Sequence, residues 1–366
     1  MNHTRRTVVA TLAALPLVPT LARAQASAGY PAGYADTVAA AKKEGKVVIY
    51  STTDTVAANP LIKDFQALYP GIAVEYNDMN STEVYNRFIA ERAAGASADV
   101  LWSSSMDLQI KLAADGHALA YASPEIAHVP SWAVWKNEAF GTTYEPIVIV
   151  YNKRLLAGDE IPQSHADMSR VFTQKADKLK GKVTTYDIEK SGVGFMLITQ
   201  DSKHNPHFWD FVKALGSTGP RFQSSSGTMM ERISSGENLL GFNIFASYAQ
   251  LREKKDPGIG IVYPKDYVLV MSRVMFIAKG GKNPNAAKLW LDYILSRRGQ
   301  AVVASQAELG SIRADVEGET TLAGYTKTLG ATLKPIPVGP ELLAYLDQAK
   351  RLDFIKQWQA AIKGSK

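Results

Sequence analysis

The chain has 366 residues, a formal net charge of +6 and no cysteine. The length fits two domains better than one. The missing cysteines exclude disulfides, thiolate catalysis and thiolate metal sites, and the interspersed acids and bases lack the basic stripe of a nucleic-acid-binding protein, so we expect no nucleic-acid partner.

The N-terminus has the order of an export signal. Arg5-Arg6 precedes the apolar run Thr7–Leu21, and the small-x-small stretch Ala22-Arg23-Ala24 follows. We predict a signal peptide over residues 1–24, with twin-arginine export as one route, and hence a periplasmic protein. Its removal takes away three arginines and no acid, which lowers the net charge from +6 to +3. The alternative, a membrane anchor, is disfavoured because the run is short and holds two prolines.

Strands and helices then alternate along the chain. Apolar runs predict buried strands at Lys46–Tyr50, Gly71–Tyr76 and Ala98–Trp102. A helix pattern follows each strand, and the second helix opens with Asn80 and Glu83, the spacing of a capping box. Strands separated by helices predict a mostly parallel sheet that is covered on both faces.

Two long apolar runs, Pro146–Asn152 and Tyr267–Ala278, flank a second strand–helix region. This arrangement predicts an α/β fold of two lobes, each a mostly parallel sheet flanked by helices, joined by two hinge strands. The predicted boundaries are 25–146 with 270–310 for the first lobe and 147–269 with 311–366 for the second.

Polar loops follow three of the predicted strands, where helix N-termini offer N–H groups to ligands in open α/β sheets. One loop holds Ser51, Thr52, Thr53 and Asp54; a second holds Ser103 and Ser104; a third, in the second lobe, spans Tyr186–Phe195. Helix capping is the better explanation of any one loop taken alone, whereas the three loops together favour a shared cleft between the lobes. The serine-rich loop Pro220–Gly227 offers further hydroxyls under the same alternative.

The ordered set "GKVVIYSTTD", "ADVLWSSS", "EPIVIVYNKRLL", "SGVGF" and "KNPNAAKLWLDYILSRRGQ" resembles the periplasmic solute-binding proteins of ABC importers, in the branch that contains the ferric-ion-binding proteins (solute-binding families 1 and 6). The resemblance covers nearly all of the chain after the signal. It implies a type II periplasmic-binding-protein fold, a solute held between the lobes, delivery to an inner-membrane permease, and no catalysis or cofactor.

The ferric members hold iron with two adjacent tyrosines. The matching positions here are Phe245 and Ala246, with Tyr248 nearby, and the first loop has no histidine. This departure disfavours bare ferric iron, and no metal ligands are predicted. The anion half of the family site is matched by Ser191-Gly192-Val193 and by Asn243, so a small organic phosphonate, phosphate or carboxylate is favoured.

Further residues were considered for the cleft. Asp54, Asp187 or Glu145 could pair with a positive group on the solute, such as an amine. Arg273 could bind an anion. Tyr144 could line the cleft near a hinge. The predicted ligand-binding set is Ser51, Thr52, Thr53, Asp54, Ser103, Ser104, Tyr144, Asp187, Ser191, Gly192, Val193, Asn243 and Arg273.

The predicted function is solute delivery by a monomeric binding protein. One alternative is a ferric or ferric-chelate binder that uses Tyr248, and a second is the ligand-binding partner of a membrane sensor. An enzyme is disfavoured because the sequence lacks the G-x-S-x-G, H-E-x-x-H and P-loop motifs.

Overall fold

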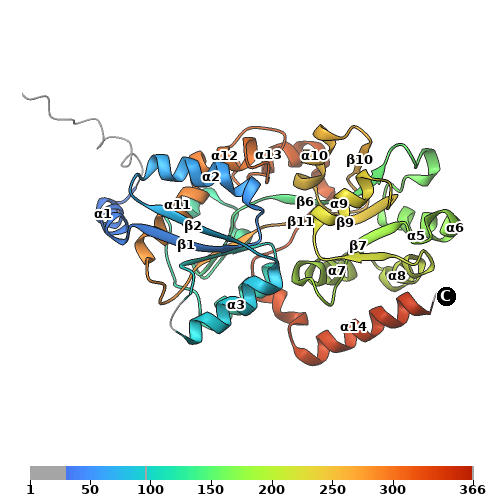
Figure 1. Cartoon of the computed structure of the whole chain (residues 1–366), viewed down its shortest axis with the longest axis horizontal. Coiled ribbons are helices and arrows are strands. Elements are labelled where there is room, and N and C mark those ends of the chain that lie inside the picture. The colour runs from blue at the N-terminus through green and yellow to red at the C-terminus, as the bar shows by residue number, and fades with distance from the viewer. Residues whose placement is uncertain (1–29, 95–96, 365–366) are drawn as a thin grey trace, which may run out of the picture.

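The computed structural model describes residues 30–94 and 97–364, and the predicted signal peptide lies outside them. The chain forms two α/β lobes side by side (Figure 1). This confirms the predicted two-lobed fold. Within the described residues, no helix is long and apolar enough to cross a membrane.

The first lobe is built on a six-stranded sheet in the order β2-β1-β3-β12-β5-β4. The first three of these strands are parallel, whereas β12, β5 and β4 each run antiparallel to a neighbour. The strands are β1 (Lys46–Ser51), β2 (Ala73–Asp78), β3 (Val100–Ser103), β4 (Val134–Trp135), β5 (Ala139–Gly141) and β12 (Val274–Ile277). The helices of this part are α1 (Tyr34–Glu44), α2 (Thr55–Leu68), α3 (Ser81–Ala93), α4 (Met106–Ala114), α11 (Pro284–Leu295) and α12 (Arg297–Ser305), with short 3-10 turns at Ile126–His128 and Ser131–Ala133.

The second lobe is built on a seven-stranded sheet in the order β13-β11-β6-β9-β7-β8, with β10 paired to β6. Its strands are β6 (Glu145–Asn152), β7 (Val183–Tyr186), β8 (Arg221–Gln223), β9 (Leu240–Phe245), β10 (Ile259–Val262), β11 (Val268–Met271) and β13 (Leu333–Pro335). The remaining helices are α5 (His165–Gln174), α6 (Ala176–Leu179), α7 (Gly192–His204), α8 (Phe208–Ser217), α9 (Ser226–Ser234), α10 (Ala246–Lys255), α13 (Leu322–Leu329) and α14 (Gln348–Lys363), with 3-10 turns at Gly158–Glu160, Gly330–Thr332 and Pro340–Tyr345. Strand β12 pairs within the sheet of the first lobe, and β13 pairs within the sheet of the second. The residue boundaries given above for the two lobes remain a prediction.

Local sequence signals explain how the elements beside the cleft begin. Asn80 accepts hydrogen bonds from the N–H groups of Thr82 and Glu83, and the Glu83 carboxylate accepts from the N–H of Asn80. The predicted capping box is therefore present, and it fixes the start of α3. Pro60 lies inside α2 and has no N–H for the carbonyl of Val56, which stands on an exposed turn and can be hydrated.

Two crossings join the lobes, between β5 and β6 and between β11 and β12. The apolar run Tyr267–Ala278 is interrupted at Ser272-Arg273, where the chain leaves one sheet and enters the other. The crossings are bonded to each other, because Thr142 N–H donates to the Arg273 carbonyl at 3.0 Å and Arg273 N–H donates to Thr143 Oγ1 at 2.8 Å. Glycine is required at Gly141, since a Cβ there would lie 2.7 Å from Ser272 Oγ. The two crossings thus form a hydrogen-bonded unit, although the first lies between β5 and β6, just before the predicted run Pro146–Asn152, which belongs to β6.

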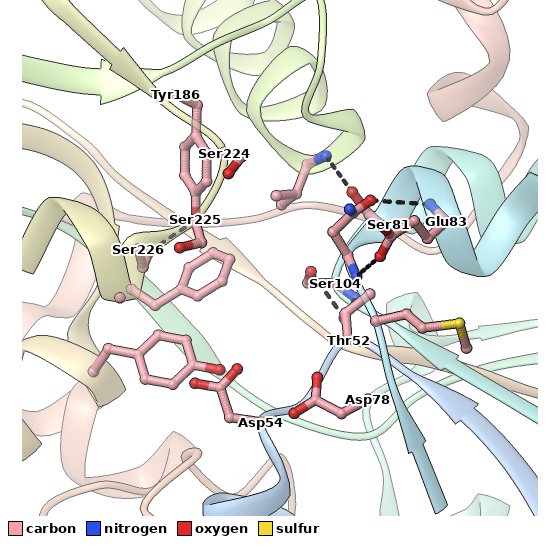
Figure 2. A pocket seen from close by; sticks show the side chains of 16 residues that line it. Thr52, Asp54, Asp78, Ser81, Glu83, Ser104, Tyr186, Ser224, Ser225 and Ser226 are labelled. Atoms are coloured by element: carbon pink, nitrogen blue, oxygen red, sulfur yellow. Dashed lines mark hydrogen bonds between the residues drawn. The ribbon is translucent and has the colours of Figure 1, made fainter.

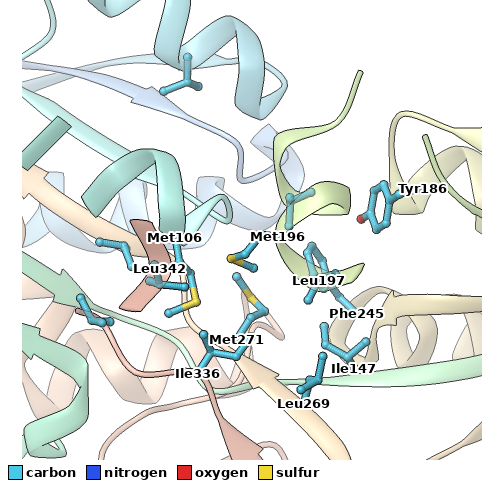
Figure 3. Packing of buried hydrophobic residues seen from close by; sticks show 14 of the residues in the cluster. Met106, Ile147, Tyr186, Met196, Leu197, Phe245, Leu269, Met271, Ile336 and Leu342 are labelled. Atoms are coloured by element: carbon cyan, nitrogen blue, oxygen red, sulfur yellow. The ribbon is translucent and has the colours of Figure 1, made fainter. Parts of the chain in front are cut away.

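An apolar cluster continues from one lobe into the other beside these crossings (Figure 3). It includes Met106 of α4, Met196 of α7, Met271 of β11 and Leu342 of the C-terminal 3-10 turn. Unbranched methionine side chains adapt to shifts of their neighbours, so this layer can keep its packing while the lobes move a little.

Candidate functional site

A cavity of about 370 Å³ lies between the two lobes at the carboxyl ends of strands from both sheets (Figure 2). This is where open α/β sheets bind ligands, and the volume lies in the usual range for small-molecule sites. The first lobe contributes Thr52, Asp54, Asp78, Met79, Asn80, Ser81, Glu83 and Ser104; the second contributes Tyr186, Val193, Ser224, Ser225, Ser226, Gly227, Phe245 and Tyr248.

The loops after β1 and β3 are tied together on the first-lobe wall. The Ser104 N–H donates to Thr52 Oγ1 at 2.8 Å, and the Thr52 hydroxyl lies 3.1 Å from Ser104 Oγ. Thr52 and Ser104 line the cavity, whereas Ser51, Thr53 and Ser103 are buried behind it. Side chains of an extended loop alternate in direction, so only every second residue of these loops faces the cavity.

Three carboxylates, those of Asp54, Asp78 and Glu83, also line the first-lobe wall. Asp78 Oδ2 accepts from the N–H of Thr55 at 2.9 Å and so caps α2. Burial raises the pKa of Asp54, and nearby Asp78 raises it further, while Arg273 and a hydrogen bond from Tyr248 act in the opposite direction. The first-lobe wall is therefore rich in hydrogen-bond acceptors.

The second-lobe wall is rich in hydroxyl groups at the start of α9. Ser225 caps this helix by accepting from the N–H of Thr228, and Ser226 Oγ lies 2.8 Å from the hydroxyl of Tyr186. Ser224 is exposed to the cavity. The first N–H groups of a helix have no partner within the helix, so this wall presents donors to an anion.

The predicted anion-binding turn at the start of α7 lies against the first lobe. Ser191 caps α7 by accepting from the N–H of Gly194, and the Val193 N–H points to Ser81 Oγ at 3.4 Å. A Cβ on Gly192 would lie 2.9 Å from both Leu108 Cδ1 and Ser105 Oγ, so this glycine lets the lobes approach closely. Val193 lines the cavity and Gly192 forms the interlobe contact beside it, whereas Ser191 is buried as the cap of α7.

Arg273 lies beneath the cavity and is fully buried, not exposed on its wall. Its Nε and Nη2 donate to the two carboxylate oxygens of Glu145 at 2.8 and 3.2 Å, and its Nη1 donates to Thr53 Oγ1 at 3.0 Å. Because Glu145 neutralises this guanidinium, the expectation of an Arg273–anion contact is corrected. The N–H groups of the Arg273 guanidinium already donate to protein acceptors, so none is left for a solute.

Three other predicted residues also lie away from the cavity. Tyr144 is buried and stacks on Tyr325 with ring centroids 6.3 Å apart. Asn243 adopts a positive φ of 58° and donates to the buried Asp201 at 2.8 Å. Asp187 accepts from the N–H groups of Glu189 and Lys190 in the turn before α7 and lines a separate surface hollow.

Sequence reasoning missed several lining residues. Asp78 ends β2 and Met79 and Asn80 follow it, so the rule that predicts the loops after β1 and β3 also applies to this position. Ser224–Gly227 falls in the serine-rich loop Pro220–Gly227, which lies outside the predicted set because helix capping also explains it. Phe245 and Tyr248 enter the sequence argument only because they stand at or near the position of the two adjacent tyrosines of the ferric members. No group of three or more His, Cys, Asp or Glu residues that could hold a metal is found among the described residues.

Comparison with known proteins gives three kinds of match. The family model described as bacterial extracellular solute-binding protein matches residues 60–327. The substrate-binding protein of an ABC transporter from Agrobacterium tumefaciens has a similar structure, with 39% identity, a TM-score of 0.83, and coverage of 87% of this chain and 94% of that chain. A curated Haemophilus influenzae protein described as uncharacterized is 23% identical over 89% of this chain and 93% of its own length.

Two more distant structures share the fold. The periplasmic binding protein AfuA from Actinobacillus pleuropneumoniae, with fructose-6-phosphate bound, is 22% identical with a TM-score of 0.73 and covers 87% of this chain and 99% of its own. Iron-bound HitA from Pseudomonas aeruginosa is 19% identical with a TM-score of 0.66 and covers 86% and 99%. At these identities the likeness concerns the architecture alone.

Proposed function

This chain belongs to the bacterial extracellular solute-binding proteins, the non-enzymatic periplasmic components of ABC transporters that bring a small solute to a membrane permease, and we propose that its own solute is a small organic anion. The anion would carry a phosphate, phosphonate or carboxylate group and would bind as the protein, a monomer, closes its lobes.

The observation that carries this proposal is the hydroxyl-rich start of α9 on the cavity wall. Ser224 and Ser226 supply hydroxyls, and the helix start supplies N–H groups with a positive partial charge. Charge-assisted hydrogen bonds of this kind contribute roughly 1.5–3 kcal/mol each. The fructose-6-phosphate bound to AfuA supports the proposal, since the shared architecture can hold an organic phosphate.

The alternative is a ferric ion or ferric chelate, and one observation favours it. Tyr186, Tyr248 and Asp54 all line the cavity, so two phenols and a carboxylate are present on its walls. Burial raises the pKa of both phenols, which opposes the phenolate form that ferric iron requires. The organic anion therefore remains the preferred solute.

A thermal-shift panel on the purified protein tests the proposal. The panel contains inorganic phosphate, sugar phosphates, phosphonates, short carboxylates, ferric chloride and ferric citrate. A solute at about 100 times its dissociation constant should stabilise the protein by about 2.7 kcal/mol. A shift with an organic phosphate, phosphonate or carboxylate supports the proposal. A shift with ferric salt alone, together with a visible charge-transfer band, contradicts it and favours the alternative.

Delivery to a sensor in place of a permease would use the same cavity. Capture of the membrane partner by the solute-loaded protein separates these two roles. Recovery of permease subunits supports the importer, and recovery of a membrane receptor alone contradicts it.

A further inference from the structure

The three carboxylates of the cavity wall differ in the hydrogen bonds that they already make within the protein. Asp78 accepts from the N–H and the hydroxyl of Thr55 at 2.9 and 3.3 Å. Glu83 accepts from the N–H of Asn80 at 3.0 Å. Each of these carboxylates therefore lies at a helix N-terminus, whose partial positive charge offsets its own.

Asp54 has no such role, although it occupies a position where aspartate usually caps a helix. It is the N-cap residue of α2, yet its side chain makes no capping hydrogen bond, and Asp78 from the neighbouring strand does the capping instead. The Asp54 carboxylate lies at the cavity, across from the serine loop at the start of α9 (Figure 2). Helix capping therefore does not explain this aspartate.

The protein also leaves the charge of Asp54 uncompensated. Among the lining residues that the structure describes, none is Lys, Arg or His. The nearby guanidinium of Arg273 is held by both oxygens of Glu145. Asp54 is therefore an exposed carboxylate at the cavity, and it has no ion-pair partner among the described lining residues.

Tyr248 is a neutral neighbour of Asp54. Its hydroxyl oxygen accepts from Arg273 Nη2 at 3.4 Å, and its hydroxyl is a hydrogen-bond partner of the Asp54 carboxylate that acts to lower the pKa of Asp54. This neutral hydrogen bond occupies part of the carboxylate and leaves the remaining lone pairs to the solute.

We propose that Asp54 is a specificity-determining residue that selects solutes with a protonated amine. The solute is then a zwitterion, with its anionic group at Ser224–Ser226 and its ammonium at Asp54. This inference rests on the proposed function, because the serine wall sets the position of the anionic end. Closure of the lobes would remove water from Asp54, so an ammonium would balance the carboxylate charge in the closed site, whereas a neutral hydroxyl would leave that charge uncompensated.

Isothermal titration calorimetry with matched probes tests the assignment. The probes are 2-aminoethyl phosphate, 2-hydroxyethyl phosphate and ethyl phosphate, together with the same three types built on longer alkyl chains. On the unaltered protein, an amine should bind at least about tenfold more tightly than the hydroxyl and alkyl partners of equal length. In Asp54→Asn, which keeps the size of the side chain and removes its charge, this preference should disappear while the alkyl phosphate binds as before.

Glu83→Gln is the matched control, because glutamine keeps the acceptor that the capping box requires. It removes a second cavity carboxylate and should leave the amine preference within about twofold of its original value. Equal binding of all three probe types contradicts the inference and leaves the proposed function intact. An equal loss in Glu83→Gln and Asp54→Asn also contradicts it. Absence of binding by every phosphate probe contradicts this inference, whereas the proposed function is contradicted only if the phosphonates and carboxylates of the thermal-shift panel fail as well.

Discussion

Arg273 and Glu145 form a fully buried ion pair where the two hinge crossings meet, with Nε–Oε1 and Nη2–Oε2 distances of 2.8 and 3.2 Å. The pair also bonds to residues from both lobes, since Arg273 donates to Thr53 and Ser247 donates to Glu145 at 2.9 Å. A charge pair shielded from solvent therefore connects the two hinge crossings to both lobes.

Removing one partner of this pair should be costly. Glu145→Gln leaves the Arg273 charge buried without a counter-ion, and the free energy of unfolding should fall by roughly 3–5 kcal/mol. Urea denaturation measures this loss. Glu253→Gln, which breaks the exposed pair with Lys153, is the control and should change stability by less than about 1 kcal/mol. Similar small losses in both variants would show that the hinge pair is not buried in solution.

A side chain at Gly192 should hold the lobes apart. Gly192→Val places atoms where Leu108 and Ser105 of the first lobe now lie, so closure should be impeded and the solute should bind at least about tenfold more weakly. Small-angle scattering of the solute-loaded protein should show a larger radius of gyration. Gly33→Ala, at a position with open space, is the control. Unchanged affinity and radius in Gly192→Val would contradict the close interlobe contact.

The serine wall should contribute most of the binding of the anionic group. Ser224→Ala combined with Ser226→Ala removes two cavity hydroxyls, and the dissociation constant for the anion found in the panel should rise by at least about tenfold. Ser191→Ala combined with Asn243→Ala is the informative comparison, since these residues cap α7 and bond to Asp201. The variant with Ser191→Ala and Asn243→Ala should have a clearly lower melting temperature, while its dissociation constant for the anion should change little. If the Ser191 and Asn243 variant instead loses affinity and the Ser224 and Ser226 variant does not, the anion binds at the start of α7 and the prediction is wrong.

Asp107 should make stability depend on pH. It is buried at the start of α4, near the interlobe contact, and burial raises its pKa to about 6. A raised carboxyl pKa favours the folded state below its ordinary value near 4, and this contribution is lost as the pH rises through about 6. Asp107→Asn keeps the acceptor for Ser105 and the Leu108 N–H. Relative to this variant, the unaltered protein should lose about 3 kcal/mol between pH 4 and pH 7. Parallel melting curves across that range would contradict the prediction.

The local features of this protein were accessible from its sequence. The alternation of apolar runs and helix patterns predicted the strands beside the cleft, because each pattern reflects the period of one element. The capping box of Asn80 and Glu83 was predicted and found, since its partners are three residues apart. The loops after β1 and β3 both contribute to the predicted ligand-binding set, and Thr52 and Ser104 are in contact, because adjacent parallel strands end at the same edge of a sheet.

Contacts between distant segments needed the tertiary structure. Arg273 was predicted to face the solute, but its partner Glu145 lies 128 residues away in sequence, and no local pattern pairs them. Asn243 is likewise held by Asp201, 42 residues away. The sequence placed Ser51–Asp54 in one polar loop, yet only the packed fold determined that Thr52 and Asp54 face the cavity while Ser51 and Thr53 are buried. The sequence thus determined the elements and their order through short-range periodicity, whereas the packing of the two lobes decided which polar groups are neutralised inside the protein and which remain free to bind a solute.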